Sequence, residues 1–539
     1  MISALEIAGT RGAFSNVVYQ RQKVLMPGTR AVQISAFYSL MGCALILIAT
    51  SRYGIGLSAD SVTYLAGARN ILEGHGYLNI SEAPILAFPP LFSTLIAILS
   101  WGGWSDPAGM ARLINVLCFG LVVFLAAQWS FRHLRSSTLA ALGTTAVLFA
   151  PPLLAISVYA WSEALFLALT MLMLLQLQRD DFTHSLTPWV LTGMFAALAI
   201  LDRYAGITVL ITGAILLAAK RMDSLLSLVG RLSLSLSIAV LPVSLWFYRN
   251  YAISSTFTGY RAASSRTWIE TGYDMLNVLS IWFLPPSVPF RFRMCLILLL
   301  IVICSCIVFA VPGRKIGAAD IRGIVPFLLF TGIYAIFMIY TTSTTALSPI
   351  DDRYMSPIFV PLILSLFYLI DRLMSQSSPA AGNAIYRAII AASLAIWLTY
   401  PIVTVSKMVK AYIEQGAGGF STAYWVESDL IAYLKSSKLS GTIYTNEPSG
   451  VYALTGQAYK QTPEKFAYES QVPTDDLLHF RADVQSQGVI YIVWFHTDWW
   501  KGWLYDIDDL KKICHLERIV TRRDGDVYRV RFSQCRQPT

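Results

Sequence analysis

Apolar runs that are long enough to cross a lipid bilayer recur along this 539-residue chain, and they restrict its fold more than any other feature. A helix needs roughly 20 apolar residues to cross the hydrocarbon core of a membrane. Charged residues make up only 14% of the sequence, against about 25% in soluble domains. We therefore predict a polytopic α-helical membrane protein with 11 spans, at about 33–51, 110–130, 138–156, 163–178, 188–202, 205–219, 228–248, 293–311, 323–341, 356–370 and 385–405.

Basic residues indicate how these spans are oriented. Arg11, Arg21, Lys23 and Arg30 precede the first span, and most later basic clusters fall in short loops between spans. Lys and Arg are enriched in the cytoplasmic loops of membrane proteins. The N-terminus is therefore predicted to be cytoplasmic and the C-terminus to lie outside. These clusters account for the net charge of +9 and give no reason to expect nucleic-acid binding.

A further apolar stretch, 85–101, is short and interrupted by prolines. If it crossed the membrane, every later basic cluster would lie on the wrong side, so we predict that it lies at the outer surface or re-enters there. The remaining polar segments then gather on the outer face. They are Asp60, "VYAWSE" (158–163), "LDRY" (201–204), "YRNY…GYRAASSR" (248–266) and "DDRY" (351–354).

After residue 405 the apolar runs give way to alternating helix and strand patterns. "VESDLIAYLKSSK", "TDDLLHFRADVQSQG" and "YDIDDLKKI" are typical of helices, whereas "GTIYTN" (before a turn) and "VIYIVWF" are typical of strands. The predicted organisation is a cytoplasmic segment (1–32), a transmembrane domain (33–405) with its first outer loop at 52–109, and a small C-terminal α/β extracytoplasmic domain (406–539).

Two features of this outer domain have alternative explanations. Cys514 and Cys535 bracket a predicted hairpin with an Asp-Gly turn. They would form a disulfide in an oxidising compartment, but two free thiols are an equal alternative. The stretch "FHTDWWKGW" (495–503) either offers aromatic faces to a sugar or membrane, or anchors the domain at a hydrophobic surface.

The polar residues of the outer face also have two explanations each. Asp60 opens a helical pattern, so Ser58 or Asp60 is an N-cap, or Asp60 is a catalytic acid at an exposed helix start. Glu163 opens an apolar span, where a carboxylate is costly unless it faces water, protein or a metal, although a helix N-terminus favours it. Arg203 either binds a phosphate or forms an ordinary ion pair with Asp202. The sequence has no Walker loop, no dinucleotide-binding glycine motif after a strand, no H-E-x-x-H and no paired C-x-x-C.

Taken in order, the motifs resemble those of the GT-C superfamily of lipid-linked glycosyltransferases. The likeness is to the branch that holds aminoarabinose transferases of lipid A, protein O-mannosyltransferases and their bacterial relatives. The motifs are "DSVTYLAGARNILEGHGY", "FPPLFSTLIAILSWGGWSDPAGMARLIN", "SEALFLALTMLMLL", "LDRYAG", "WFYRN", "DDRYMSPIFVPLIL" and "NEPSGVYALTG". The resemblance extends from about 33 to 365 and more loosely over the tail. It implies the GT-C fold, with about 11 transmembrane helices and juxtamembrane helices on the outer face.

The resemblance also implies roles for individual residues. Asp60 and Glu163 correspond to the catalytic acids, and many relatives carry a further acid where this chain has Ser61. Ser61 argues against a metal held by an acidic pair, while a divalent ion between Asp60 and Glu163 stays an open alternative. Residues assigned to the donor phosphate are Arg203, Arg353 and Arg249, and weaker substrate contacts are Tyr64, His75, Arg112 and Tyr354.

The prediction that follows is an inverting glycosyltransferase of the inner (plasma) membrane, with its C-terminal domain periplasmic or extracellular. A sugar would pass from a polyprenyl-phosphate donor to a hydroxyl group of a glycolipid, polysaccharide or protein. Asp60 would accept the hydroxyl proton, and arginines would stabilise charge on the departing phosphate. A flippase for lipid-linked oligosaccharides and a non-catalytic envelope assembly protein are the two alternatives.

Overall fold

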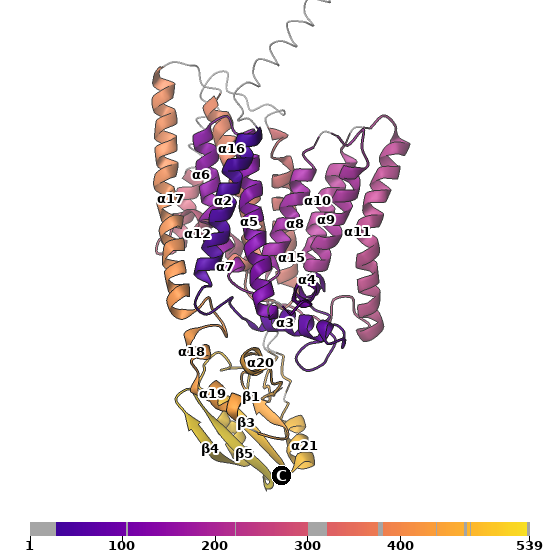
Figure 1. The fold of residues 1–539 in the computed structure, drawn as a ribbon, viewed down its shortest axis with the longest axis vertical. Helices are drawn as coiled ribbons and strands as arrows, with labels where there is room; N and C mark the ends of the chain where they lie inside the picture. The colour runs from indigo at the N-terminus through magenta and orange to yellow at the C-terminus, as the bar shows by residue number, and fades with distance from the viewer. Residues whose placement is uncertain are drawn as a thin grey trace, which may run out of the picture.

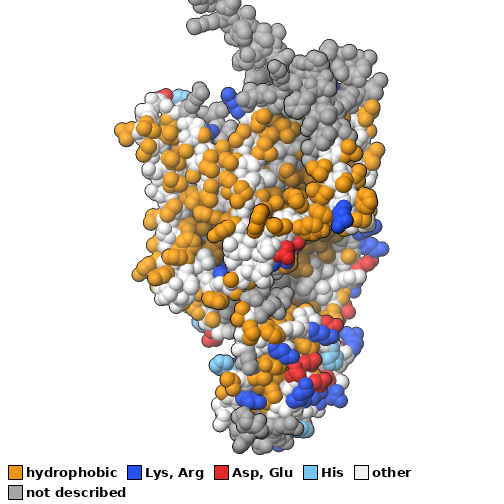
Figure 2. All heavy atoms as spheres, turned by 180° about the vertical axis from the view of Figure 1, so that it is seen from behind, with side chains coloured by type: hydrophobic (Ala, Val, Ile, Leu, Met, Phe, Trp, Pro, Cys, Tyr) orange, Lys and Arg blue, Asp and Glu red, His pale blue; other side chains and the backbone are white. Residues whose placement is uncertain are grey.

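The computed structural model describes residues 28–103, 106–179, 181–220, 222–299, 321–375, 381–437, 439–467, 472–474 and 476–535. A bundle of long helices makes up most of the molecule, and a small sheet domain lies at one end of the bundle (Figure 1). Hydrophobic side chains cover the helical part, whereas charged side chains gather over the sheet domain (Figure 2). This distribution agrees with a membrane-embedded bundle that carries a water-exposed domain.

Six described helices are long and apolar enough to cross a membrane. They are α2 (Gly28–Ala49), α5 (Pro107–His133), α11 (Leu225–Ser254), α15 (Val325–Thr344), α16 (Asp352–Ser375) and α17 (Ala381–Gln415). A seventh crossing results if α6 (Ser137–Leu148) and α7 (Pro151–Ser157), which meet at a 43° bend, are taken together.

Shorter apolar helices occupy the other expected positions. They are α8 (Glu163–Gln176), α9 (Thr187–Asp202) and α10 (Ile207–Ala218), which follows the 3-10 turn η1 (Tyr204–Gly206). The expected span 293–311 extends into residues outside the described ones. Length and composition thus support six or seven crossings in the described chain, and do not establish the predicted number of 11.

The stretch 85–101 forms one ten-residue helix, α4 (Leu91–Ser100). Such a helix is about 15 Å long, half of what a bilayer crossing requires, so a non-crossing position fits it. It packs against α3 (Ala59–Leu72), where Ser93 donates a hydrogen bond to the carbonyl of Tyr64 over 2.9 Å. Both helices lie at the end of the bundle that faces the sheet domain (Figure 1).

Helix α12 (Trp268–Phe283) was not expected, because its residues were interpreted as part of an outer loop. A capping box between Thr267 and Glu270 starts this helix. Trp282, near its end, packs edge-on against Phe359 of α16, with ring centroids 5.0 Å apart. Because α12 mixes polar and apolar residues, its sequence does not have the continuous apolar run that is typical of a membrane span.

The C-terminal domain begins later than residue 406, because α17 continues to Gln415. Its five-stranded sheet has the order β2-β1-β3-β5-β4. The strands are β1 (Ile443–Thr445), β2 (Lys460–Gln461), β3 (Val489–Phe495), β4 (Cys514–Arg522) and β5 (Gly525–Cys535), and the helices are α18 (Ala423–Val426), α19 (Asp429–Ser436), α20 (Pro448–Thr455), α21 (Leu477–Gln487) and α22 (Ile507–Ile513). Strand β1 is parallel to β2 and β3, and β5 is antiparallel to β3 and β4. Helix α20 stands where the sequence suggested a turn.

The tryptophans of the stretch 495–503 and the two cysteines of the predicted hairpin have defined places in this domain. Trp500 and Trp503 are buried in the domain core, so neither of these two rings is presented to a sugar or a membrane. Trp499 is half-exposed, and its indole nitrogen donates to Glu447. The antiparallel register places Cys514 opposite Cys535, as a disulfide between them would require, and that bond stays a prediction.

Candidate active site

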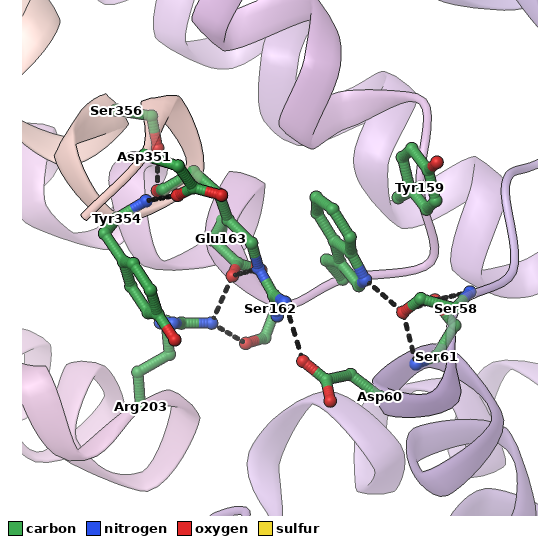
Figure 3. Close-up of polar contacts among 12 residues, drawn as sticks. Ser58, Asp60, Ser61, Tyr159, Ser162, Glu163, Arg203, Asp351, Tyr354 and Ser356 are labelled. Carbon is green, nitrogen blue, oxygen red and sulfur yellow. Dashed lines mark hydrogen bonds and ion pairs between the residues drawn. The ribbon is translucent and has the colours of Figure 1, made fainter. Parts of the chain in front are cut away.

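The start of α3 presents Asp60 to solvent without using it as a cap. Ser58 is the N-cap, and its hydroxyl accepts a hydrogen bond from the amide of Ser61 over 3.3 Å. The Ser61 hydroxyl in turn accepts from the amide of Ser58 over 3.1 Å, which completes a capping box. Ser61 therefore serves the helix start, and its buried side chain faces Ser58 (Figure 3). The alternative that Asp60 is the cap is wrong, and its carboxylate is left for other contacts.

Arg353, at the start of α16, joins the two predicted acids. Its Nη1 lies 2.7 Å from Oδ2 of Asp60, and its Nε donates to Oε1 of Glu163. The guanidinium carbon also lies 3.9 Å from the ring centroid of Trp161. A cation above an aromatic face is held by the electrons of the ring, so Trp161 adds a further support for Arg353.

Arg203, which follows α9, approaches Glu163 from a second direction. Its Nη1 lies 2.7 Å from Oε1 of Glu163 and 3.2 Å from the hydroxyl of Ser162. The alternative in which Arg203 pairs with Asp202 is therefore wrong. Asp202 is buried, and neither of its carboxylate oxygens has a hydrogen-bond partner among the described residues.

The two acids differ in access to solvent. The side chain of Glu163 is 1% exposed and that of Asp60 is 34% exposed. A buried carboxylate is costly unless it is paired, and Glu163 has two guanidinium partners, although its Oε2 has no partner in the described chain. Asp60 can therefore meet a substrate directly, whereas Glu163 can act only through Arg203 and Arg353.

A cavity of about 310 Å³ lies beside these residues. Its polar lining includes Asp60, Arg203, Arg261 and Arg353, and its aromatic lining includes Tyr64, Phe88, Tyr204, Tyr334, Phe337 and Tyr354. Burial raises the pKa of the Tyr64 phenol, which therefore stays protonated at neutral pH, and its hydroxyl lies 3.0 Å from that of Ser162. The cavity combines arginine side chains with a largely aromatic and apolar lining.

Arg261 is the cavity arginine that has no carboxylate partner among the described residues. Its Nη2 donates to the carbonyl oxygen of Ala87 over 3.1 Å, and Ala87 itself lines the cavity. Arg203 and Arg353 are balanced by Glu163 and Asp60. Two of the three cavity arginines are therefore paired with carboxylates, and Arg261 is not.

Besides Glu163, which lies behind Arg203 and Arg353, three predicted site residues do not line this cavity. Arg249 donates to the carbonyl of Ile85 over 3.0 Å and lies 4.7 Å from the ring centroid of Trp246. Arg112 donates to the hydroxyl of Thr50 and the carbonyl of Leu47, at the end of α2. The side chain of His75 is 62% exposed and lies 3.5 Å from Glu73.

Several residues in or beside the cavity were not predicted as site residues. Trp161 and Ser162 stand beside Glu163 in the quoted segment "VYAWSE", and Phe88 stands in "FPPLF", so their motifs pointed to them. Arg261 lies in a segment that the topology placed on the outer face. Tyr334, within the apolar helix α15, has no signal in the sequence.

A divalent ion does not fit between the two acids in this arrangement. Oδ2 of Asp60 and Oε1 of Glu163 both face Arg353, so a cation there would replace or repel the guanidinium. Within the described ranges, no three His, Cys, Asp or Glu residues form a group that could hold a metal ion. The chemistry is therefore derived from the arginines and from Asp60.

No protein-family model and no curated protein matches this sequence. Solved structures do resemble it. ArnT from Cupriavidus metallidurans bound to undecaprenyl phosphate has a TM-score of 0.57, with 13% identity over 92% of this chain and 97% of that chain. Apo ArnT has a TM-score of 0.54, with 12% identity over 93% and 98%.

The archaeal oligosaccharyltransferase AglB from Archaeoglobus fulgidus, in complex with an inhibitory peptide and a dolichol-phosphate, has a TM-score of 0.51. Its identity is 11% over 87% of this chain and 69% of that chain. At identities this low, the likeness shows a shared fold. That fold is the one which the ordered outer motifs led us to expect.

Proposed function

From the GT-C fold that this chain shares with ArnT and AglB, we propose that it is a membrane glycosyltransferase. A sugar is transferred from a polyprenyl-phosphate donor to a hydroxyl group of a lipid, glycan or protein acceptor on the outer face of the membrane. One observation carries this proposal: a solvent-reachable acid, Asp60, is bound to Arg353 at the edge of an arginine-containing cavity with a largely apolar lining.

The donor phosphate lies beside Arg203, Arg261 and Arg353. A sugar phosphodiester carries one negative charge, and Arg261 is the cavity arginine whose guanidinium has no carboxylate partner among the described residues. Guanidinium groups bind phosphate oxygens by paired, charge-assisted hydrogen bonds. Phe337 and Met338 of α15 line the same cavity and give apolar surface to the first isoprene units. Arg249 binds the carbonyl of Ile85 and so holds the loop that leads to Ala87, a cavity residue. Its effect on the donor is therefore indirect.

Asp60 is the general base in this proposal. Arg353 binds its Oδ2, and Oδ1 accepts the proton of the acceptor hydroxyl as its oxygen attacks the anomeric carbon. The bond between that carbon and the phosphate oxygen breaks, and polyprenyl phosphate leaves with the bonding electrons. The arginines stabilise the charge that grows on this phosphate. Attack opposite the leaving group inverts the anomeric configuration.

Glu163 is a positioning residue in this scheme. It is buried and reaches the reactants only through Arg203 and Arg353. By holding both guanidinium groups, it sets their spacing before the donor enters, and pre-organised charges stabilise a transition state without the cost of reorganisation.

The proposal is tested with purified protein in lipid nanodiscs that contain a membrane lipid extract and a radiolabelled polyprenyl-phosphate sugar. Transfer of the label to a hydroxyl-bearing product is the expected result. In parallel, proteoliposomes report whether the labelled donor crosses the bilayer. Crossing without transfer would favour the flippase and contradict the proposal, and neither activity would favour an assembly role.

A further inference from the structure

The segment that joins α17 to the C-terminal domain contacts the residues just before Asp60. Gly56 and Leu57 lie between two other stretches of chain, each of which forms a parallel bridge with them. On one side, Gly56 donates to the carbonyl of Val158 over 2.7 Å and accepts from the amide of Ala160 over 2.9 Å. This side leads directly to Trp161, Ser162 and Glu163.

On the other side, the linker (residues 416–421) pairs with residues 55–57. Leu57 donates to the carbonyl of Gly418 over 3.3 Å, and Phe420 donates to the carbonyl of Leu57 over 2.7 Å. The hydroxyl of Ser421 donates to the carbonyl of Ile55 over 2.5 Å. The linker thus extends a ladder of backbone hydrogen bonds whose far strand, residues 158–160, leads to Glu163.

Glycine is required for this close approach. Gly418 has φ +133° and Gly419 has φ +57°, conformations that other residues adopt with strain. A Cβ at Gly418 would lie 1.8 Å from the hydroxyl of Tyr159, and a Cβ at Gly419 would lie 2.0 Å from the carbonyl oxygen of Leu57. Tyr159 in turn stacks on Trp161, with centroids 4.2 Å apart, and Trp161 supports Arg353.

The other end of the linker is fixed in the C-terminal domain. Phe420 packs against Trp425 at 5.2 Å between ring centroids, and Trp425 packs against Phe495 of β3 at 4.9 Å. A second contact joins the domain to the helix of Asp60, since the guanidinium of Arg69 lies 5.3 Å from the ring of Tyr452.

We propose that Gly416–Ser421 is a positioning element for the transfer reaction, through which the C-terminal domain fixes the placement of Asp60 and Arg353. This inference rests on the proposed function for its effect on catalysis. Its structural part, that the linker holds residues 55–58 in place, has a separate readout.

The test compares Gly418→Ala and Gly419→Ala with Gly456→Ala and Gly488→Ala. All four glycines have a positive φ, but a Cβ at Gly456 or Gly488 would meet no atom within 4 Å. The controls therefore carry the backbone strain without the collision with Tyr159 or Leu57. Ser421→Ala is a milder variant that removes one hydrogen bond and adds no atoms.

The first readout is steady-state transfer. For Gly418→Ala and Gly419→Ala we expect kcat to fall about tenfold or more, because small misplacements of catalytic groups are costly. KM for the donor should change less than kcat, since two of the three arginines assigned to the donor phosphate, Arg203 and Arg261, stay in place. Ser421→Ala should give a smaller fall in kcat, and the two controls none. Equal losses in all four glycine variants would overturn the inference.

The second readout, which needs no activity, is amide hydrogen exchange of Gly56, Leu57 and Phe420 in the full-length protein. We expect faster exchange at these amides in the linker variants, Ser421→Ala included, and unchanged exchange in the controls. Unchanged exchange in the linker variants would overturn the positioning role. Absence of transfer by the wild-type protein would instead overturn the proposed function, so the two failures are distinguishable.

Discussion

Arg353 contacts Glu163 across 190 positions of the chain, and it contacts Asp60 across still more. The loop charges placed these residues on one face of the membrane, and the family resemblance implied their roles. That reasoning gives a shared face and no side-chain direction. It therefore selected Arg249, Arg112 and His75 as well, whose side chains bind a loop, the end of α2 and Glu73.

Glu163 and Asp202 are two buried acids near Arg203, and they give a prediction at the residue scale. In Glu163→Gln, the guanidinium groups of Arg203 and Arg353 lose their shared charge partner, and breaking a buried pair costs about 3–5 kcal/mol. We expect a clear fall in the thermal unfolding midpoint in detergent. Asp202→Asn is the matched control, because the Asp202 carboxylate has no partner among the described residues. Its midpoint should be unchanged or higher; a larger fall than in Glu163→Gln would contradict the assignment.

Arg261 gives a second residue-scale prediction. Hydrogen bonds to charged groups contribute about 1.5–3 kcal/mol, so Arg261→Gln should weaken the binding of undecaprenyl phosphate by roughly tenfold or more. Binding is measured by titration of the purified protein. Arg112→Gln removes an arginine on the same face and outside the cavity, and its affinity should equal that of the wild type. Equal affinities of Arg261→Gln and wild type would remove Arg261 from the phosphate site.

At the scale of elements, periodic and apolar patterns located most helices and the buried strand β3, because such patterns are local. Helix α12 was missed because its composition is mixed. The bend between α6 and α7 lies just before Pro151 and Pro152, the first two residues of α7, within one apolar run. The ladder of residues 55–57 with 158–160 and 418–420 could not be predicted, because it depends on backbone approach between distant segments and not on side-chain periodicity.

Glu447, just before α20, gives a prediction on pH. Burial raises the pKa of this carboxyl to about 7, although Thr497 and Trp499 donate to it. The folded domain therefore binds a proton more tightly than the unfolded chain does, so its stability is highest below pH 4.5 with respect to this group. Stability falls as the pH rises from about 4.5 to 7, by up to about 3 kcal/mol.

Chemical unfolding of the full-length protein, followed at the C-terminal domain by the fluorescence of its tryptophans, measures this dependence. The fall between pH 5.5 and pH 8 should be reduced in Glu447→Gln, which stays neutral throughout. An unaltered fall in Glu447→Gln would assign the pH dependence to another group.

At the scale of the whole molecule, the site and the C-terminal domain share one end of the helical bundle (Figure 1). We predict that this end is extracytoplasmic. In a background without native cysteines, Gln487→Cys should react with a membrane-impermeant maleimide in right-side-out vesicles, because residue 487 is exposed on the C-terminal domain. Thr138→Cys, exposed at the start of α6 at the opposite end, should react only after permeabilisation. The reverse pattern would invert the topology.

The type of fold could be predicted from the order of motifs, since those of the helical bundle gather at the same end of it. The cavity could not, because its walls come from α3, α15, α16 and the loop around Ala87, and their packing is set by side chains that the patterns do not rank.

The most direct test is the rate of sugar transfer by Asp60→Asn, measured beside its binding of undecaprenyl phosphate. The substitution keeps the size of the side chain and removes its ability to take up a proton. Because general base catalysis contributes about 10²–10⁴-fold, transfer should fall by that order while binding of undecaprenyl phosphate persists. Transfer by Asp60→Asn at the wild-type rate would contradict the account.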